Sequence, residues 1–330
     1  MEKEKVENVS VVCQGDYYMV SNNGIYYKVG LFEGRMLMHL VNNESREYIL
    51  AQEGITEEEY MFLLETFEKS GIIGERIKDR FNLLFIKIPL FNIDGWLDRF
   101  CVWFRKHKIT KQILRSILWN CILIGIANII VNYKEIFRLQ SIQLAWYDYL
   151  LAYALYTIII FLHELSHGYV CKSYGGKVGK IGIAFIVFTP AMYCDVSGVR
   201  MFKEKYKQIF TSAAGFFVNA VFVGVFSVIS HWDSNPLWKT MIILNVMSVF
   251  INSIPFIRLD GYWILSFFIG IQNLYNKSIL KIKNIKKKSE FKNWKDYFCL
   301  VYGVLNMIMI IYCCTRFVVG TLGMVIDLLM

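Results

Sequence analysis

The residues best suited to chemistry in this sequence are His163, Glu164 and His167, which form an H-E-x-x-H motif. On a helix, positions 163 and 167 project from one face, so both imidazoles can reach one Zn²⁺ ion at about 2.0–2.1 Å. Glu164 would then act as a general base, which is the arrangement of zinc-dependent hydrolases. The motif predicts a hydrolytic site with one zinc ion per chain.

The motif ends an apolar stretch, residues 144–170, that is long enough to cross a bilayer. An ionisable side chain at the centre of a membrane helix costs about 2.5–3.5 kcal/mol on insertion scales. On a soluble helix the motif often arises by chance, but within a membrane helix a cost of this size indicates a function. We therefore expect the zinc site to lie within membrane depth.

The composition is that of an integral membrane protein. Hydrophobic residues make up 55% of the chain and charged residues only 19%, whereas soluble domains carry about 25% charged residues. The eight cysteines contain no C-x-x-C pair, which argues against a thiolate zinc site. The N-terminal residues lack the basic and apolar regions of a signal peptide, so we expect a cytoplasmic N-terminus.

Five segments have the roughly 20 apolar residues that a membrane helix needs. They are residues 113–131, 144–170, 209–229, 238–257 and 297–319. Residues 261–274 are apolar but too short to cross, and they predict a re-entrant or interfacial helix. Residues 181–188 predict extended or hairpin chain dipping toward the membrane, which is tolerated there only where it lines a cavity.

Basic residues form three clusters beside these segments: six in residues 99–115, seven in residues 172–207 and eight in residues 277–295. With a cytoplasmic N-terminus, five spans place all three clusters on the cytoplasmic side, as the positive-inside rule requires. A solvated face or a contact with anionic lipid is the alternative explanation for each cluster, and both also indicate the inner leaflet. The sequence predicts an integral protein of the cytoplasmic membrane.

Residues 9–78 predict a separate small soluble domain. Alternating apolar and polar residues around the turn Asn22-Asn23-Gly24 predict a β-hairpin. Helical patterns follow in residues 33–41, 44–51 and 56–70, the last with a capping box between Thr56 and Glu59. A hairpin followed by three helices is typical of a winged helix-turn-helix domain.

The charge of this domain favours peptide or protein over DNA as its partner. Residues 1–75 carry 6 Lys/Arg and 14 Asp/Glu, a net charge of −8. Such a surface repels phosphate, so we expect no nucleic acid. A leader peptide with basic flanks would complement it, bound as an added strand at the hairpin edge near residues 17–28.

A catalytic zinc needs a third protein ligand and an open position for water. Asp260 follows a long apolar run and is expected on the same side of the membrane as His167, so it is the candidate third ligand. The alternative is an interfacial carboxylate paired with Arg258. Five histidines in all are too few for a membrane di-iron oxygenase, and three of them are expected at the surface: His39, His107 and His231.

Four stretches of sequence carry a family pattern: HELSHGYVCKSYGG from His163, the segment 190–195, SAAGFFVNA at 212–220 and PFIRLDGYWIL at 255–265. Together they resemble the site-2 protease (M50) family of intramembrane zinc metallopeptidases, in its peptide zinc metalloprotease branch. Members of that branch often lie in gene clusters for ribosomally synthesised and modified peptides (RiPPs). Residues 9–78 look like the PqqD-type leader-recognition domain of such clusters, so the resemblance covers nearly the whole chain.

The resemblance implies that His163, His167 and Asp260 ligate zinc and that Glu164 activates the attacking water. Zinc would lower the pKa of its bound water toward about 7, and Glu164 would take the proton and later return it to the leaving amine. Because a helical peptide bond is shielded, the substrate must unwind, and the extended segment 181–188 could bind it as an added strand.

Further positions match the family less directly. Asn219 matches a family Asn that helps to position substrate or the active-site helix, although an interhelical hydrogen bond explains it equally well. Tyr193 and Asp195 match a branch-specific motif and would line the site. The family has Asn directly before the Pro of its Asp-Gly motif, where this sequence has Ile254. This departure puts substrate handling near Pro255 in doubt, but not metal binding.

The expected fold class is an α-helical polytopic membrane protein, with about five spans plus re-entrant elements, that carries a small N-terminal α+β winged-helix-like domain. It divides into an acidic PqqD-like domain at 1–78, an amphipathic juxtamembrane connector at 79–112 and an intramembrane zinc metallopeptidase domain at 113–330. The expected partners are a peptide or membrane-protein substrate and membrane lipid.

Two other classes of function compete with a protease. A non-catalytic membrane receptor, immunity or export partner would hold a precursor peptide through the acidic domain, but it gains little from a general base beside a metal site. A zinc transport or storage protein would carry more His or acidic residues along several spans.

Overall fold

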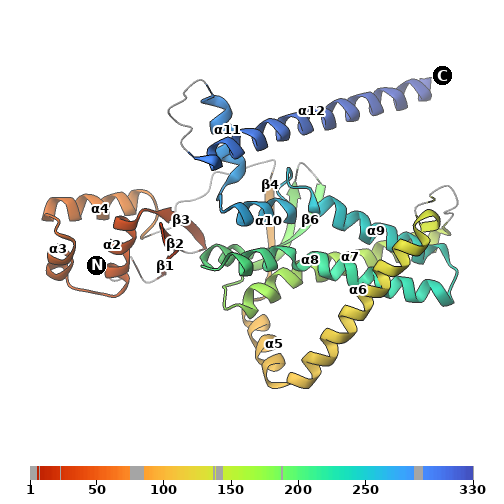
Figure 1. The fold of residues 1–330 in the computed structure, drawn as a ribbon, viewed down its shortest axis with the longest axis horizontal. Coiled ribbons are helices and arrows are strands. Elements are labelled where there is room, and N and C mark those ends of the chain that lie inside the picture. Colours follow the sequence, from red (N-terminus) through yellow and green to blue (C-terminus); the bar gives the residue numbers. More distant parts are fainter. Residues whose placement is uncertain are drawn as a thin grey trace. The chain divides into compact units, whose positions relative to one another are not determined.

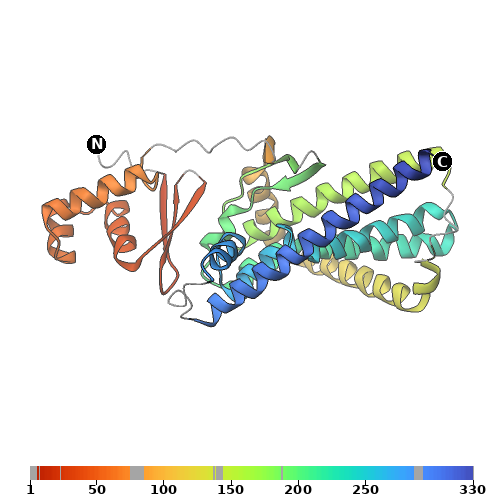
Figure 2. The ribbon, with the colours of Figure 1, turned by 90° about the horizontal axis from the view of Figure 1, so that it is seen from above.

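The computed structural model of the chain describes residues 8–22, 24–74, 85–136, 144–186, 189–285 and 293–329, together with Val6 and Arg138. Helices dominate, and two three-stranded sheets accompany them (Figures 1 and 2). The chain forms two compact units, Met1–Ser248 and Val249–Met330. Several expected features lie partly outside the described residues: Asn23 of the turn, residues 79–84 of the connector, residues 187–188 of the extended segment and residues 286–292 of the third basic cluster.

The N-terminal strands β1 (Val9–Cys13), β2 (Tyr18–Asn22) and β3 (Ile25–Val29) form an antiparallel sheet in that order. The pairing of β2 with β3 confirms the expected hairpin and leaves β3 as an outer strand. The sequence does not predict β1, because the mostly apolar run VSVVC has no clear alternation to separate a strand from a helix.

Helices α2 (Leu31–Val41), α3 (Arg46–Glu53) and α4 (Glu57–Lys69) confirm the three expected helical patterns. The capping box is present, since the Glu59 carboxylate accepts from the Thr56 N–H (2.9 Å) and the Thr56 hydroxyl accepts from the Glu59 N–H (3.3 Å). The helices bury Met36, Leu37 and Tyr60 completely. This is a small domain of strands and helices, whereas its winged-helix assignment remains a prediction.

Four helices are long and apolar enough to cross a membrane among the described residues: α6 (Lys108–Ile136), α7 (Trp146–Ser173), α8 (Lys205–Trp232) and α12 (Trp294–Leu329, of which Trp294–Cys313 qualifies). The other expected span, residues 238–257, falls on α9 (Pro236–Ser253), which has 18 residues and carries Lys239, Asn245 and Asn252. The structure thus supports four spans, and a count of five remains a prediction.

Small residues let α6 and α8 approach closely. A Cβ on Gly224 of α8 would fall onto the backbone of Cys121 in α6, and one on Gly125 would meet the backbone of Gly224. Asn128 then donates a hydrogen bond across the same pair of helices to Ser227 (2.8 Å). Close backbone packing joined by a polar contact is a common way to hold membrane helices together, because the hydrophobic effect does not drive their association in lipid.

The second sheet is formed by β4 (Phe85–Asn92), β5 (Lys180–Ile186) and β6 (Thr189–Cys194), in the order β4-β5-β6. Strands β5 and β6 confirm the expected extended segment as part of a hairpin. The connector at 79–112 contains a strand that the sequence does not predict, because its partner lies two spans later in the chain. Since β5 is the central strand, its two edges are already paired, so the expectation that a substrate adds to residues 181–188 is wrong.

After β4 the chain enters α5 (Asp94–Lys106), an amphipathic helix that buries Leu97, Cys101 and Phe104. Asp94 joins it to α7 by accepting hydrogen bonds from Lys172 (2.8 Å) and from the Val178 N–H (2.9 Å). Burial alone would raise the pKa of Asp94, but these two bonds outweigh it and hold the pKa below its usual value.

The second unit contains α10 (Asp260–Ile269), α11 (Leu274–Lys283) and α12, which share an apolar cluster around Tyr262, Leu274 and Tyr302. Helix α10 accounts for most of the short apolar segment expected at 261–274, and it ends at Gly270 in the left-handed conformation (φ 73°). Its length of 10 residues is too short to span a bilayer. Whether it is re-entrant or interfacial remains a prediction.

Candidate metal centre

Helix α7 presents His163 and His167 one turn apart, and both side chains are buried. The two ring centroids are 5.0 Å apart with the rings at 70° to each other. The i,i+4 spacing therefore brings two imidazoles together on one face, as the motif predicts. In a buried setting this pairing needs support from neighbouring elements, which α8 provides.

The backbone of α8 orients His167. Its Nδ1 lies 2.7 Å from the carbonyl oxygen of Thr211, and both groups are buried. A carbonyl oxygen can only accept, so Nδ1 carries the proton and Nε2 is left as the ligand nitrogen. A hydrogen bond from the outer nitrogen of a histidine to a carbonyl is typical of metal sites, because it fixes both the tautomer and the ring plane.

One turn further along α8, Gly215 makes room for His163. A Cβ at Gly215 would fall onto the imidazole ring of His163. Thr211 and Gly215 are four residues apart, so one face of α8 contacts both histidines. Position 215 therefore needs glycine, because the His163 ring packs directly against the α8 backbone there.

Replacing Gly215 by alanine should therefore weaken zinc binding, since the His163 ring must move from its position. We expect a loss of about 10- to 100-fold in zinc affinity, the range seen when groups that support metal ligands are removed. Competition with a chromophoric chelator in detergent would measure it. Gly95→Ala is the matched control, because a Cβ at Gly95 meets nothing within 4 Å. Equal affinities in the two variants would contradict the assignment.

Asp260 completes a group with the two histidines. One ligand atom from each of His163, His167 and Asp260 lies within 4.8 Å of the others. Two imidazole nitrogens and one carboxylate oxygen form a donor set that suits Zn²⁺, and three protein ligands leave a position open for water. The residues present therefore fit a catalytic rather than a structural zinc ion.

Asp260 is the first residue of α10, and the chain before it is held by two polar side chains of α12. The Tyr302 hydroxyl donates to the carbonyl of Pro255 (2.8 Å), and the Asn306 amide donates to the carbonyl of Phe256 (2.7 Å). Sequence reasoning missed both side chains. Their signal is visible, since Tyr302 and Asn306 are polar residues at i,i+4 within an apolar span.

Arg258, the alternative partner of Asp260, contacts α11. Its guanidinium donates to Asn276 Oδ1 (3.2 Å) and lies 4.7 Å from the ring centroid of Tyr275. The role of Asp260 as the third metal ligand remains a prediction.

Glu164 is oriented by a backbone group of β6. Its Oε2 accepts a hydrogen bond from the Cys194 N–H at 2.9 Å. The thiol of Cys194 is partly buried near the Glu164 carboxylate, and burial first and that negative charge second raise the pKa of the thiol. Cys194 is thus a neutral thiol, and its contribution to the site is made by the main chain.

Tyr193 and Asp195 flank Cys194, and neither is in the metal group. Burial raises the pKa of Tyr193, whose ring centroid lies 5.0 Å from Lys87 Nζ. Asp195 Oδ1 accepts hydrogen bonds from the N–H (3.1 Å) and hydroxyl (2.6 Å) of Ser197 at the start of the short helix η2 (Ser197–Met201). Their predicted site-lining role remains a prediction, and Asp195 in addition fixes the turn after β6.

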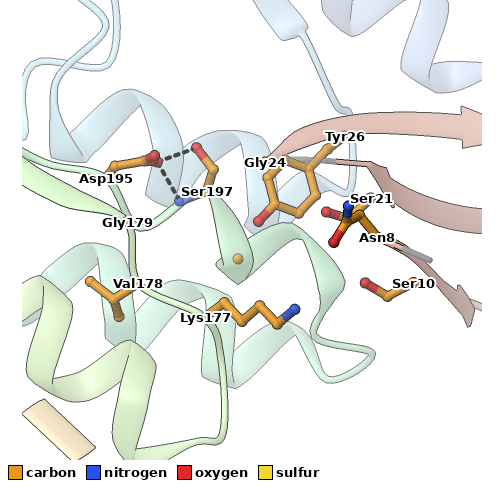
Figure 3. Close-up of a pocket in the computed structure, with 11 residues that line it drawn as sticks. Asn8, Ser10, Ser21, Gly24, Tyr26, Lys177, Val178, Gly179, Asp195 and Ser197 are labelled. Atoms are coloured by element: carbon orange, nitrogen blue, oxygen red, sulfur yellow. Dashed lines mark hydrogen bonds between the residues drawn. The ribbon is translucent and has the colours of Figure 1, made fainter. Parts of the chain in front are cut away.

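Asp195 also lines a polar cavity of about 170 Å³ (Figure 3). The N-terminal strands supply Ser10, Ser21 and Tyr26 to its wall, and the chain after α7 and β6 supplies Lys177 and Ser197. Nearby, the Gln14 amide donates to the carbonyls of Met201 (3.2 Å) and Phe202 (3.1 Å). The N-terminal domain therefore contacts the segment that continues from Cys194.

The Asn219 amide donates a hydrogen bond to the Ser248 hydroxyl of α9 (2.8 Å). This is the interhelical contact that was the alternative to substrate positioning, and the second role remains a prediction. His107 and His231 are exposed as expected, while His39 is half-buried between Glu44 (2.5 Å) and Glu53 (3.3 Å). The surface assignment is therefore only approximate for His39.

Among the described residues, the chain combines four helices that are long and apolar enough to cross a membrane with a His-His-Asp group whose donors suit zinc. The chain belongs to the peptidase M50B-like family, that is, to the site-2 protease family, whose model matches residues 136–318. This confirms the resemblance seen in the sequence motifs at the level of the family.

Two relatives carry similar descriptions. The chain is 28% identical to YydH of Bacillus subtilis (strain 168), named as a candidate peptide zinc metalloprotease, over 220 residues that cover 65% of this chain and 82% of the relative. It is 30% identical to the zinc metalloprotease MJ0392 of Methanocaldococcus jannaschii over 173 residues, which cover 50% of this chain and 46% of that relative. No solved structure matches the chain. The family and these relatives support a membrane zinc protease.

Proposed function

We propose that this protein hydrolyses a peptide bond within a peptide or a membrane segment, with one zinc ion held by His163, His167 and Asp260. The observation that carries the proposal is the convergence of these three donors, two of which flank Glu164 in an H-E-x-x-H motif, in a chain of the M50B-like family. Cleavage of a precursor peptide by the reconstituted protein, and its loss in a Glu164→Gln variant, is the direct test.

The zinc ion would supply a Lewis acid that polarises the scissile carbonyl and acidifies a water molecule. Glu164 takes a proton from that water and delivers it to the leaving amine, as a general base and then a general acid. The hydrogen bond from the Cys194 N–H holds one carboxylate oxygen, so the carboxylate keeps its orientation during both transfers. Thr211 and Gly215 keep the imidazoles in place.

The outer edge of β6 is the better place for an extended substrate. The Asp195 N–H donates to Lys180 on the β5 side (3.0 Å), so the N–H of the preceding Cys194 points to the opposite side, where Glu164 lies. By the alternation of a strand, the main-chain groups of Met192 point to the same outer side as those of Cys194. A substrate strand added there would place its peptide groups beside the catalytic carboxylate.

The substrate we propose is a precursor peptide of the ribosomally synthesised and modified class, recognised through a PqqD-like domain at residues 1–78. The acidic charge of this domain and its outer strand β3 support strand addition of a basic leader, and nucleic acid is disfavoured. The contact of Gln14 with Met201 and Phe202 joins this domain to the chain that follows β6. We propose that the N-terminus is cytoplasmic. We further propose that residues 79–112 form a juxtamembrane connector and that residues 113–330 form the peptidase domain.

Removing residues 1–78 should leave zinc bound but should slow the processing of a full-length precursor, because the leader would no longer be held near β6. Binding of the precursor to the intact chain should weaken as salt is raised from about 0.05 to 0.5 M, since charge attraction is screened. Fluorescence anisotropy with labelled precursor and with duplex DNA would measure both. Binding of DNA without binding of precursor would overturn the leader assignment.

A non-catalytic receptor or export partner is the competing proposal. It also uses the acidic domain, but it gives no reason for an H-E-x-x-H motif whose histidines meet Asp260. Retention of full function after loss of Glu164 would favour it.

A further inference from the structure

Helix α5 carries a stripe of exposed aromatic side chains. Trp96, Phe100 and Trp103 lie at i, i+4 and i+7 and are 38–52% exposed, while the adjoining face of the helix buries Leu97, Cys101 and Phe104. The rings of Trp96 and Phe100 stack with centroids 5.3 Å apart. Because these aromatic side chains are exposed, the face of α5 that carries them also needs an apolar environment.

The contacts of α5 with α7 show at which level along α7 the helix α5 lies. Lys172 forms ion pairs with Asp94 (2.8 Å) and Asp98 (3.1 Å), and the ring of Phe100 meets that of Tyr169 at 5.7 Å between centroids. These contacts lie in the last turn or so of α7, which ends at Ser173. At 1.5 Å per residue, α5 is therefore held within about 6 Å of the end of a spanning helix.

Helix α5 also runs across the direction of α7 and α8, not along it (Figures 1 and 2). It is followed after one residue by α6, the first expected span, which begins at Lys108. A helix that lies across the spans at the level where one ends and another begins lies in the plane of the membrane surface. Exposed Trp and Phe at this level belong at the boundary between headgroups and acyl chains.

The charges on α5 agree with a membrane surface. Arg99, Arg105 and Lys106 are exposed, while Asp94 and the exposed Asp98 share Lys172 as their partner, so these six side chains carry a net charge of +2. The charge that α5 offers outward is thus positive. Basic residues near an aromatic stripe favour anionic phospholipid.

We propose that α5 is an interfacial helix that binds anionic phospholipid, with Trp96, Phe100 and Trp103 inserted below the headgroups and Arg99, Arg105 and Lys106 on the phosphates. The same helix packs on the metal helix, because Leu97 lies against Gly168, the neighbour of His167. Anionic lipid therefore stabilises the element that braces the metal site. The proposal does not depend on zinc or on proteolysis.

The first test measures the depth of the two indoles. The full chain and a Trp96→Phe/Trp103→Phe variant are reconstituted in phosphatidylglycerol vesicles, with and without bromine on the acyl carbons near the headgroup. The fluorescence difference between the two proteins isolates Trp96 and Trp103 from the other tryptophans. We expect this difference to be largely lost in the brominated vesicles. A difference signal of equal intensity in both vesicles would overturn the proposal.

The second test concerns the headgroup. Native mass spectrometry of the full chain with added phosphatidylglycerol should show bound lipid that falls roughly tenfold or more in an Arg99→Gln/Arg105→Gln/Lys106→Gln variant. A control with the same charge change in the N-terminal domain, Lys28→Gln/Arg46→Gln/Lys69→Gln, should retain lipid as the parent does. Unchanged lipid retention in the α5 variant, or a second copy of the chain bound in place of lipid, would contradict the proposal.

Discussion

A Glu164→Gln variant should keep its zinc and lose its proteolytic activity. The amide preserves the shape of the side chain and can still accept the hydrogen bond from the Cys194 N–H, which measures 2.9 Å to the carboxylate. It cannot take up a proton, however, and general base catalysis contributes about 10²- to 10⁴-fold. We expect kcat to fall by that amount with little change in KM. Single-turnover cleavage of a precursor peptide encoded beside the gene would measure it.

Glu135→Gln is the matched control, because Glu135 is an exposed residue of α6 outside the site. It should cleave at the parent rate. Zinc content, measured by mass spectrometry of the metal, must be equal in all three proteins. Activity of the Glu164→Gln variant within a factor of two of the parent would exclude Glu164 as the base.

Loss of any one of His163, His167 or Asp260 should abolish stoichiometric zinc binding. Each Ala substitution leaves only two protein donors, whereas catalytic zinc sites keep three. The purified parent should hold one zinc ion per chain, and each variant should hold close to none after dialysis. Because the two histidines lie in a buried, close-packed region, His163→Ala could also disturb folding, so size-exclusion profiles should accompany the metal measurement.

Two controls separate the metal ligands from their neighbours. His107→Ala removes an exposed histidine, and Arg258→Ala removes the alternative partner of Asp260. Both should retain zinc. If Asp260→Ala retains full zinc occupancy, the third ligand is not Asp260.

The sequence predicts the histidine pair and the proposed base, Glu164, because their spacing is local. A helix alone brings His163 and His167 to one face, and no knowledge of the rest of the fold is needed. The groups that support them could not be predicted in the same way. Cys194 and Thr211 act through a backbone N–H and a backbone carbonyl, which every residue possesses and which therefore leave no trace in the residue type.

Some supporting residues could be predicted in part from their type. They are Gly215, Tyr302 and Asn306. A glycine in a membrane helix predicts close approach, but not that a catalytic ring is the approaching group. A polar pair at i,i+4 in an apolar span predicts a buried hydrogen-bonding face, but not the carbonyls of Pro255 and Phe256 that it meets. In both cases the type of interaction can be predicted while the partner cannot.

Strand pairing also could be predicted only where the two strands are close in the sequence. The β2–β3 hairpin could be predicted because a turn signal joins its strands, whereas β4 pairs with β5 across two helices of spanning length. Such pairing depends on topology and not on local pattern. The mistaken expectation that substrate adds to residues 181–188 has the same origin, because β5 looks like an edge strand until β4 is known.

The pairing of β4 with β5 also sets an order of assembly. Strand β4 is synthesised before α6 and α7, and β5 after them, so the two strands cannot pair until both long helices have been made. Strand β6 then follows β5, and only at that stage can the Cys194 N–H reach Glu164. Glu164, the proposed base, is therefore oriented only after both helices and β6 have been made, and we expect the nascent chain to lack proteolytic activity until then.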